Sequence, residues 1–267
     1  MSDPQKDHAR FSPSSVSRRM LCPGSLGLEE RLPHTSSDYA EEGTAAHELM
    51  EWAFRDGATL LAQYKGRKAR NGWTINDEMI ENVQVFITNI YNVVKSFEAL
   101  GATVTIFCEE RVSFAAEMGD IEEDNDEENF FGTADIILVA EFPDGTAIIS
   151  IDDLKYGKGV QVEAKNNKQT LTYALAVVSL YGLIYDIKRV RMAIHQPRLD
   201  HISEWEVPVE RVYKFREKLK PAAKLCIGIA DDLKAGRTTI KKIDKAGYLV
   251  PRSEERRVGK ECRSRWS

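Results

Sequence analysis

Two apolar runs on either side of a tight turn constrain the fold of this 267-residue chain more than any other feature of its sequence. Residues 134–142 and 147–155 have the length and apolar character of strands, and the tripeptide PDG stands between them. The pattern predicts an antiparallel hairpin with its tip at Asp144. Residues at equal distances from Asp144 then face each other, so Asp135 should lie opposite Asp153.

The predicted hairpin ends in a cluster of charges. Like charges that face each other across a sheet repel, so Asp135 and Asp153 require a compensating cation. Lys155 lies two residues beyond Asp153 and therefore points to the same face. Two acids and a lysine at one sheet edge suit a divalent ion such as Mg²⁺, which binds a few carboxylates, water and phosphate oxygens. Such an ion lowers the pKa of its bound water, and a nearby lysine can position that water as an ammonium or deprotonate it as a free amine.

A plainer alternative assigns these charges no catalytic role. In that interpretation Asp135 and Asp153 are solvated acids at the hairpin end, and Lys155 pairs with one of them. Asp152 should point to the opposite face, where we expect a helix cap or a salt-bridge partner rather than a ligand.

The rest of the chain alternates between helical and strand-like patterns. A helix that begins near Glu42 would place His47 and Glu51 on one face. Apolar residues at helical spacing predict further helices over 77–100, 167–180 and 210–234. The first of these is capped by Asn76 or Asp77 and stopped by Gly101. Strand patterns cover 103–110, 111–114, 189–199 and 203–209. We therefore expect an α/β (α+β) fold, with a mixed sheet flanked by helices.

Composition excludes several classes of protein. With 42% hydrophobic and 30% charged residues, the chain is neither disordered nor fibrous. No apolar run approaches the ~20 residues of a membrane-spanning helix, and the polar start MSDPQKDHAR lacks a secretory signal. We expect a cytoplasmic protein of a bacterial host cell with no membrane partner. The cysteines are too scattered for a disulfide scaffold or a complete zinc site, and they are Cys22, Cys108, Cys226 and Cys262.

Charge and composition also suggest boundaries along the chain. Residues 1–40 are rich in Ser, Pro and Arg and predict a loop segment with at most one short helix. A single domain over 41–251 follows, with an insertion loop at 117–128 that has eight acids and no base. Residues 252–267 resemble a translated sequencing adaptor, and we interpret them as a non-native tail that replaces the true C-terminus. The alternative is a natural basic tail.

Five sequence motifs, taken in order, resemble one enzyme superfamily. They are GTAAH at 43–47, CEERV at 108–112, GTAD at 132–135, DLKYGKG at 153–159 and QTLTY at 169–173. Together they resemble the PD-(D/E)XK nucleases, in particular the RecB-like and CRISPR-adaptation exonucleases, and most closely a group of phage and prophage proteins. The resemblance runs from about Ser12 to Pro251 and implies a restriction-endonuclease-like core.

The resemblance also implies roles for individual residues. Asp135 and Asp153 would bind a catalytic Mg²⁺ or Mn²⁺ ion together with His47 and the acid of the first core strand, and Lys155 would act on the attacking water. Glu109 matches that acid best, although Glu110 adjoins it and strand alternation lets only one of them face the site. His47 would otherwise be a hydrogen-bonded core histidine.

Gln169 and Tyr173 belong to the last of these motifs. They lie four residues apart on one helical face, so both could reach the scissile phosphate. Otherwise they are a polar pair that lines the seam between helix and sheet. Basic residues around the predicted site would supply positive charge for a phosphate backbone, and they are Lys155, Lys158, Lys165, Lys168, Arg18 and Arg19. The alternative is that they are ordinary surface residues.

Cys22 carries a separate implication of the resemblance. Related proteins often bind a 4Fe-4S cluster through one cysteine near the N-terminus and three at the C-terminus, and Cys22 matches the first position. No such triplet is present here, and one thiolate cannot hold a cluster that needs four. The resemblance therefore implies a cluster in the untruncated protein only.

The function implied by the resemblance is metal-dependent hydrolysis of DNA. We expect a Mg²⁺- or Mn²⁺-dependent deoxyribonuclease, an exonuclease by its resemblance, that acts in phage or prophage recombination, replication or repair. Its partners would be DNA and a phage recombinase, annealing protein or helicase. The alternative is a non-catalytic DNA-binding or recombination accessory protein with a nuclease-like fold.

Overall fold

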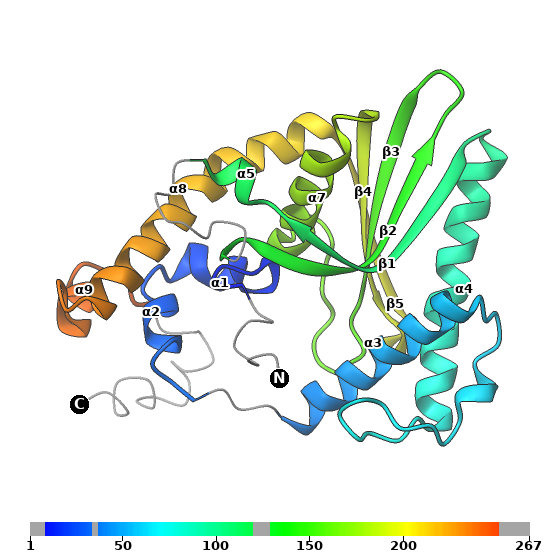
Figure 1. Cartoon of the computed structure of the whole chain (residues 1–267), viewed down its shortest axis with the longest axis horizontal. Helices are drawn as coiled ribbons and strands as arrows, with labels where there is room; N and C mark the ends of the chain where they lie inside the picture. Colours follow the sequence, from blue (N-terminus) through cyan, green and yellow to red (C-terminus); the bar gives the residue numbers. More distant parts are fainter. Residues whose placement is uncertain (1–8, 34–36, 120–128, 251–267) are drawn as a thin grey trace.

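A five-stranded mixed sheet forms the centre of the molecule (Figure 1). The computed structural model describes residues 9–33, 37–119 and 129–250. The strands follow the chain order β1-β2-β3-β4-β5, and all neighbours are antiparallel except β3 and β4. Their bounds are β1 Thr103–Ser113, β2 Phe131–Glu141, β3 Thr146–Leu154, β4 Asp186–Gln196 and β5 His201–Pro208. The expected α/β fold with a mixed sheet between helices is confirmed.

The β2–β3 hairpin has the predicted register. Ile136 pairs with Asp152, and the ladder continues in the same register to the turn. Gly145 has a φ of 81°, which a turn residue without a Cβ adopts readily. Asp135 and Asp153 therefore lie at facing positions, one residue beyond the last ladder pair.

Helices cover both faces of the sheet. On one face lie α3 and α4, whose apolar residues pack against Ile136 and Leu138 of β2. On the other face lie α7 and α8, which share a core with Ile137 and Ile149. The four helices are α3 Asp38–Asp56, α4 Asp77–Ala99, α7 Lys168–Tyr181 and α8 Val209–Lys234. Asn76 caps α4 as predicted, because its side chain accepts a hydrogen bond from the Met79 amide.

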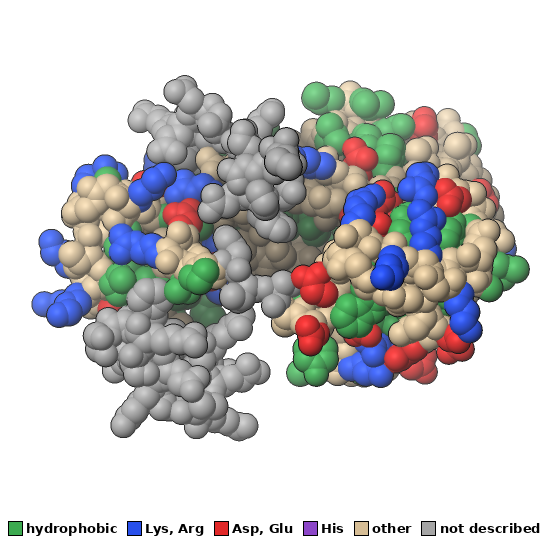
Figure 2. Space-filling view, turned by 60° about the horizontal axis from the view of Figure 1, so that its bottom comes forward, with side chains coloured by type: hydrophobic (Ala, Val, Ile, Leu, Met, Phe, Trp, Pro, Cys, Tyr) green, Lys and Arg blue, Asp and Glu red, His purple; other side chains and the backbone are tan. Residues whose placement is uncertain are grey.

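Short elements complete the fold. They are η2 Pro13–Ser15, α1 Val16–Leu21, α2 Ser25–Glu29, η3 Ala62–Tyr64, α5 Ala115–Met118, η4 Pro197–Leu199 and α9 Ile240–Lys245. Figure 2 shows the surface hollowed between the part built by α8 and α9 and the part built by α3 and α4. None of the described helices is long and apolar enough to cross a bilayer.

Three local predictions need correction. The region 1–40 holds η2, α1 and α2 rather than one short helix, because Phe11, Val16 and Leu26 are buried in the core shared with α8. The predicted strands 103–110 and 111–114 form the single strand β1. The strand predicted to Leu199 ends at Gln196, where Pro197 begins a 3-10 turn.

The remaining boundary predictions are only partly within the described residues. In the acidic loop, Glu117 and Met118 belong to α5, and residues 120–128 lie outside the described residues. Residues 252–267, which we interpret as a non-native tail, also lie outside the described residues.

Asp152 lies fully buried on the α4 face of the sheet, opposite to Asp153 as predicted. Its Oδ1 is 2.8 Å from Arg191 Nη1 and 2.8 Å from His195 Nε2, and Ser150 donates to its Oδ2 at 2.7 Å. Burial alone would raise the pKa of Asp152, but the His195 hydrogen bond and the Arg191 charge outweigh burial and lower it. Asp152 is therefore an ion-pair partner, one of the two roles expected for it.

From this buried ion pair we predict that replacing each of two arginines of β4 will lower the free energy of unfolding by very different amounts. Arg191→Met would leave Asp152 without its guanidinium and should lower the free energy of unfolding by about 3–5 kcal/mol. Arg189→Met removes a more exposed pair with Glu206 and should cost less than about 1 kcal/mol. The side chains of Arg191 and Arg189 are 8% and 49% exposed, respectively. Urea unfolding of both variants measures the two losses, and equal losses would contradict this assignment.

Candidate metal centre

The candidate site lies where β1 and β2 share an irregularity in their pairing. Cys108 pairs with Ile136 and Glu110 with Ala134, whereas Glu109 and the facing Asp135 fall out of the ladder. Glu109 has a φ of 51°, in the left-handed region that non-glycine residues rarely adopt. The usual alternation of side chains therefore shifts by one position at this point of the strand.

The shift decides which acid of the CEERV motif enters the site. Glu109 turns toward α3, where its Oε1 lies 3.2 Å from His47 Nδ1. Glu110 lies near α7 instead, where its charge adds to burial in raising the pKa of Tyr181. The structure thus brings Glu109 to His47, as the sequence favoured, and leaves Glu110 outside.

His47, Glu109 and Asp135 form a compact donor set. His47 Nδ1 lies 3.2 Å from Glu109 Oε1 and 3.4 Å from Asp135 Oδ1. Each residue offers one ligand atom, and these atoms all lie within 4.8 Å of one another. The three residues come from α3, β1 and β2, and as a group they could hold a metal ion.

Asp153 and Lys155 lie on the other side of Asp135. Lys155 Nζ is 2.8 Å from Asp153 Oδ2, and Gln169 Nε2 donates to Asp153 Oδ1 at 3.0 Å. Asp135 Oδ2 accepts from the Leu154 amide at 2.6 Å, which ties β2 to the end of β3. Asp153 Oδ2 is buried, and Lys155 is the cation that compensates its charge.

Tyr173 lies close to the same charges. Its ring borders Gly132, because a Cβ added to that glycine would lie 2.9 Å from Tyr173 Cε1. Burial, followed by the charges of Asp135, Asp153 and Glu109, raises the pKa of the Tyr173 hydroxyl far above its usual value. Its phenol is therefore neutral.

The charges of the site balance one another only in part. Burial opposes a charged imidazole, but Asp135 and then Glu109 outweigh burial and raise the pKa of His47 well above its usual value. Against burial, His47 and Lys155 lower the pKa of Asp135. Burial raises the pKa of Glu109 and of Asp153. Three carboxylates therefore share two cationic side chains, and a divalent ion would relieve the excess negative charge.

The other predicted site residues lie elsewhere or are already paired. Arg18 and Arg19 both pair with Glu29, at 2.9 and 2.8 Å. Lys158 pairs with Glu78 at 2.7 Å, while Lys165 and Lys168 have no ion pair among the described residues. The arginines of α1 are therefore held by α2.

Cys22 lies against the last described residues of the chain. It is the C-cap of α1, and its Sγ accepts from the Val250 amide at 3.3 Å. Cys226 is buried in α8 and Cys108 lies on β1, and among the described residues no metal-binding group contains Cys22. Cys262 lies outside the described residues, and a 4Fe-4S cluster stays a prediction.

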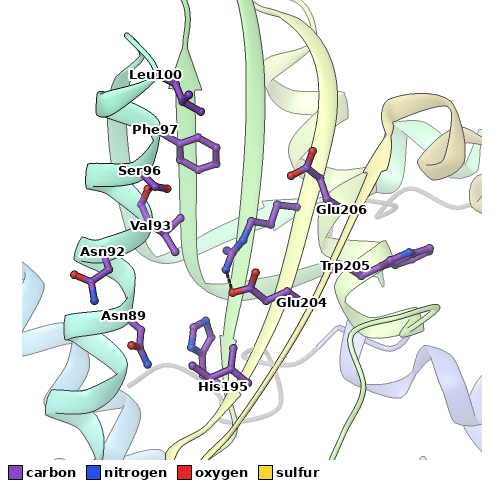
Figure 3. A pocket seen from close by; sticks show the side chains of 12 residues that line it. Asn89, Asn92, Val93, Ser96, Phe97, Leu100, His195, Glu204, Trp205 and Glu206 are labelled. Atoms are coloured by element: carbon purple, nitrogen blue, oxygen red, sulfur yellow. Dashed lines mark hydrogen bonds and ion pairs between the residues drawn. The ribbon is translucent and has the colours of Figure 1, made fainter.

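A separate pocket, which we did not expect from the sequence, opens between α4 and the β4–β5 strands (Figure 3). It has a volume of about 630 Å³, and its floor includes Arg191 and His195 of the Asp152 network. Asn89, Asn92 and Glu204 line its walls. The pocket lies on the α4 face and contains none of the residues of the metal centre.

Comparison with other proteins adds a family and a distant structural likeness. Residues 8–254 match the sequence profile of a family described as "Protein of unknown function (DUF2800)". The chain is also similar to the crystal structure of SSO0001, with 13% sequence identity and a TM-score of 0.28. That alignment covers 80% of this chain and 86% of the other.

The charge balance predicts how His47 titrates in metal-free protein. In EDTA, its imidazole should titrate above the ordinary value of 6.5 in an NMR experiment, because Asp135 and Glu109 stabilise the cation. Asp135→Asn should lower that pKa, whereas Asp186→Asn at the exposed start of β4 should leave it unchanged. Since a metal bound at Nδ1 must displace the proton, metal affinity should increase with pH. A His47 pKa at or below 6.5 in the parent would contradict the assignment.

Proposed function

The chain belongs to the DUF2800 family, and from the site that its fold assembles we propose that it is a divalent-metal-dependent deoxyribonuclease. One observation carries the proposal: three carboxylates, a histidine and a lysine meet at one end of the sheet. The ordered motifs that resemble those of the PD-(D/E)XK nucleases support it, and among these the RecB-like exonucleases indicate an exonuclease.

The residues at the site fit a hard divalent ion. Carboxylate oxygens suit Mg²⁺ and Mn²⁺, and an imidazole nitrogen is an accepted ligand for first-row metals. His47, Glu109 and Asp135 would hold the ion. Asp153 would complete the set, because it faces Asp135 across the hairpin at the same end of the sheet. We infer Mg²⁺ or Mn²⁺ from this chemistry.

The reaction is hydrolysis of a phosphodiester. Water oxygen forms a bond to phosphorus, the bond from phosphorus to the leaving oxygen breaks, the water gives up a proton and the leaving oxygen gains one. A bound divalent ion supplies Lewis acidity, which lowers the pKa of water and neutralises charge on the phosphate.

The protein's own groups orient the reactants. Asp153 holds the Lys155 ammonium in place, and that ammonium can donate to the attacking water or to a phosphate oxygen. Gln169 fixes the Asp153 carboxylate from α7. Tyr173 packs against Gly132 from α7, so its neutral phenol would support the site from behind β2.

A non-catalytic DNA-binding or recombination accessory protein is the second candidate. It would have no need for the complete set of acids and lysine, and the presence of that set favours catalysis. A phage recombinase, annealing protein or helicase remains a proposed partner of either kind of protein.

Cleavage assays on Lys155→Ala separate the two candidates. The parent should release nucleotides from labelled DNA in Mg²⁺ or Mn²⁺ and none in EDTA, and Lys155→Ala should lose about 100-fold or more of that activity. Lys188→Ala is the matched control, because Lys188 likewise pairs with an aspartate two residues earlier, Asp186, at 2.7 Å.

The outcome distinguishes an enzyme from a binding protein. Linear and circular substrates compared in the same assay report whether free ends are required. A parent that binds DNA but releases no nucleotide with any metal, or a Lys155→Ala variant as active as the parent, would favour the accessory protein.

A further inference from the structure

The strands that carry the metal centre continue beyond it with an exposed cation. Arg111 of β1 pairs with Thr133 of β2, and both side chains are exposed. They lie two residues from Glu109 and Asp135, respectively. Two residues of a strand advance by about 7 Å. Beyond the irregular residues, the side chains of Val112 and Ala134 lie in the core shared with α7 and α8. Alternate side chains point to opposite faces, so Arg111 and Thr133 point away from that core, to the face on which Glu109 turns toward α3, and they form the next rung beyond the metal centre.

The Arg111 guanidinium is held in place without being neutralised. Its Cζ lies 3.6 Å from the centroid of the Phe131 ring. Stacking occupies the face of the guanidinium and leaves its N–H groups, which lie in the plane, free to donate. Among the described residues Arg111 has no carboxylate partner and makes no hydrogen bond through its side chain.

The neighbouring elements η2 and α7 leave the face of this rung open. The outer ends of β1 and β2 curve away from the other strands toward α1 (Figure 1). The η2 residue Pro13 and the α7 residue Tyr173 lie on the opposite side of these strands, against Gly132. Neither of them covers the face on which Arg111 and Thr133 lie.

From this geometry we infer that Arg111 and Thr133 form a phosphate-binding subsite for the phosphate next to the one that reacts at the metal centre. The inference rests on the proposed nuclease function. A guanidinium fork matches the oxygens of a phosphate in a bidentate way, and a threonine hydroxyl can donate to a third oxygen. The phosphate could be an internal phosphodiester or a terminal 5′-phosphate, which have this chemistry in common.

Oligonucleotide binding tests the subsite. Fluorescence anisotropy with a labelled 12-nucleotide single strand, in EDTA and again in Ca²⁺, compares the parent with Arg111→Ala and Arg111→Lys. Arg111→Ala should weaken binding about tenfold through the loss of a bidentate contact. It should also reduce the slope of log K against log salt by about 0.7, the value for one phosphate contact on a single strand. Arg111→Lys keeps the charge but not the fork and should lose less.

Two controls make the test specific. Arg67→Ala removes another stacked guanidinium, 3.7 Å above the Trp52 ring, which the metal centre does not use, and should bind as the parent does. Oligonucleotides with a 5′-phosphate or a 5′-hydroxyl distinguish the two sources of phosphate. If Arg111→Ala loses affinity for both probes, the subsite binds an internal phosphodiester. If it loses affinity for the phosphorylated probe only, the subsite binds the terminal phosphate.

Different experimental results would overturn the phosphate subsite and the proposed nuclease function. Arg111→Ala with affinity within twofold of the parent and an unchanged thermal midpoint would overturn the subsite, as would a parent that binds neither probe. A parent that binds through Arg111 but cleaves nothing would retain the subsite and overturn the nuclease. If cleavage occurs, Arg111→Ala should raise KM more than it lowers kcat, because a phosphate beside the reacting one contributes to binding in both states.

Discussion

Electrostatic repulsion at the end of the β2–β3 hairpin determines how the rest of the site is built. The register places Asp135 opposite Asp153, and the neighbouring strand adds Glu109. Three buried or half-buried carboxylates at one sheet end would be unstable alone. Lys155 compensates from within the hairpin, and His47 compensates from a helix on the opposite side of Asp135. The remaining negative charge is what a divalent cation would neutralise.

The backbone conformation of Glu109 determines which side chains of β1 and β2 point into the site. A regular strand would place Glu109 on the same face as Phe107 and Asp135 on the same face as Ile137, and both of these apolar residues pack in the core shared with α7 and α8. The left-handed conformation of Glu109 shifts the alternation in β1, and the facing residue leaves the ladder with it. The same shift decides the face to which the next residues of both strands point, and it places Arg111 and Thr133 on the face of the metal centre. The metal centre and the inferred phosphate subsite therefore have one local cause.

Sequence reasoning predicted what depends on local chemistry. The PDG turn and two apolar runs are sufficient for the hairpin register, and strand alternation places Asp152 on the opposite face from Asp153. His47 required the resemblance to known nucleases, because nothing near it in the sequence indicates contact with Glu109. The helices α1 and α2 are too short to have a clear period, and their stability comes from packing on α8. The positive φ of Glu109, the stacking of Arg111 on Phe131 and the pocket beside α4 all depend on non-local contacts.

The central claim is that the charges gathered at this sheet end bind one divalent cation. Anomalous diffraction from crystals soaked in Mn²⁺ tests it most directly. The account predicts one strong peak within bonding distance of Glu109 and Asp135, with His47 as a further ligand and Asp153 completing the set. Lys155 should lie beside the ion without contacting it. Saturated crystals that bind no Mn²⁺ at these residues, or that bind it only on other surface carboxylates, would contradict the account.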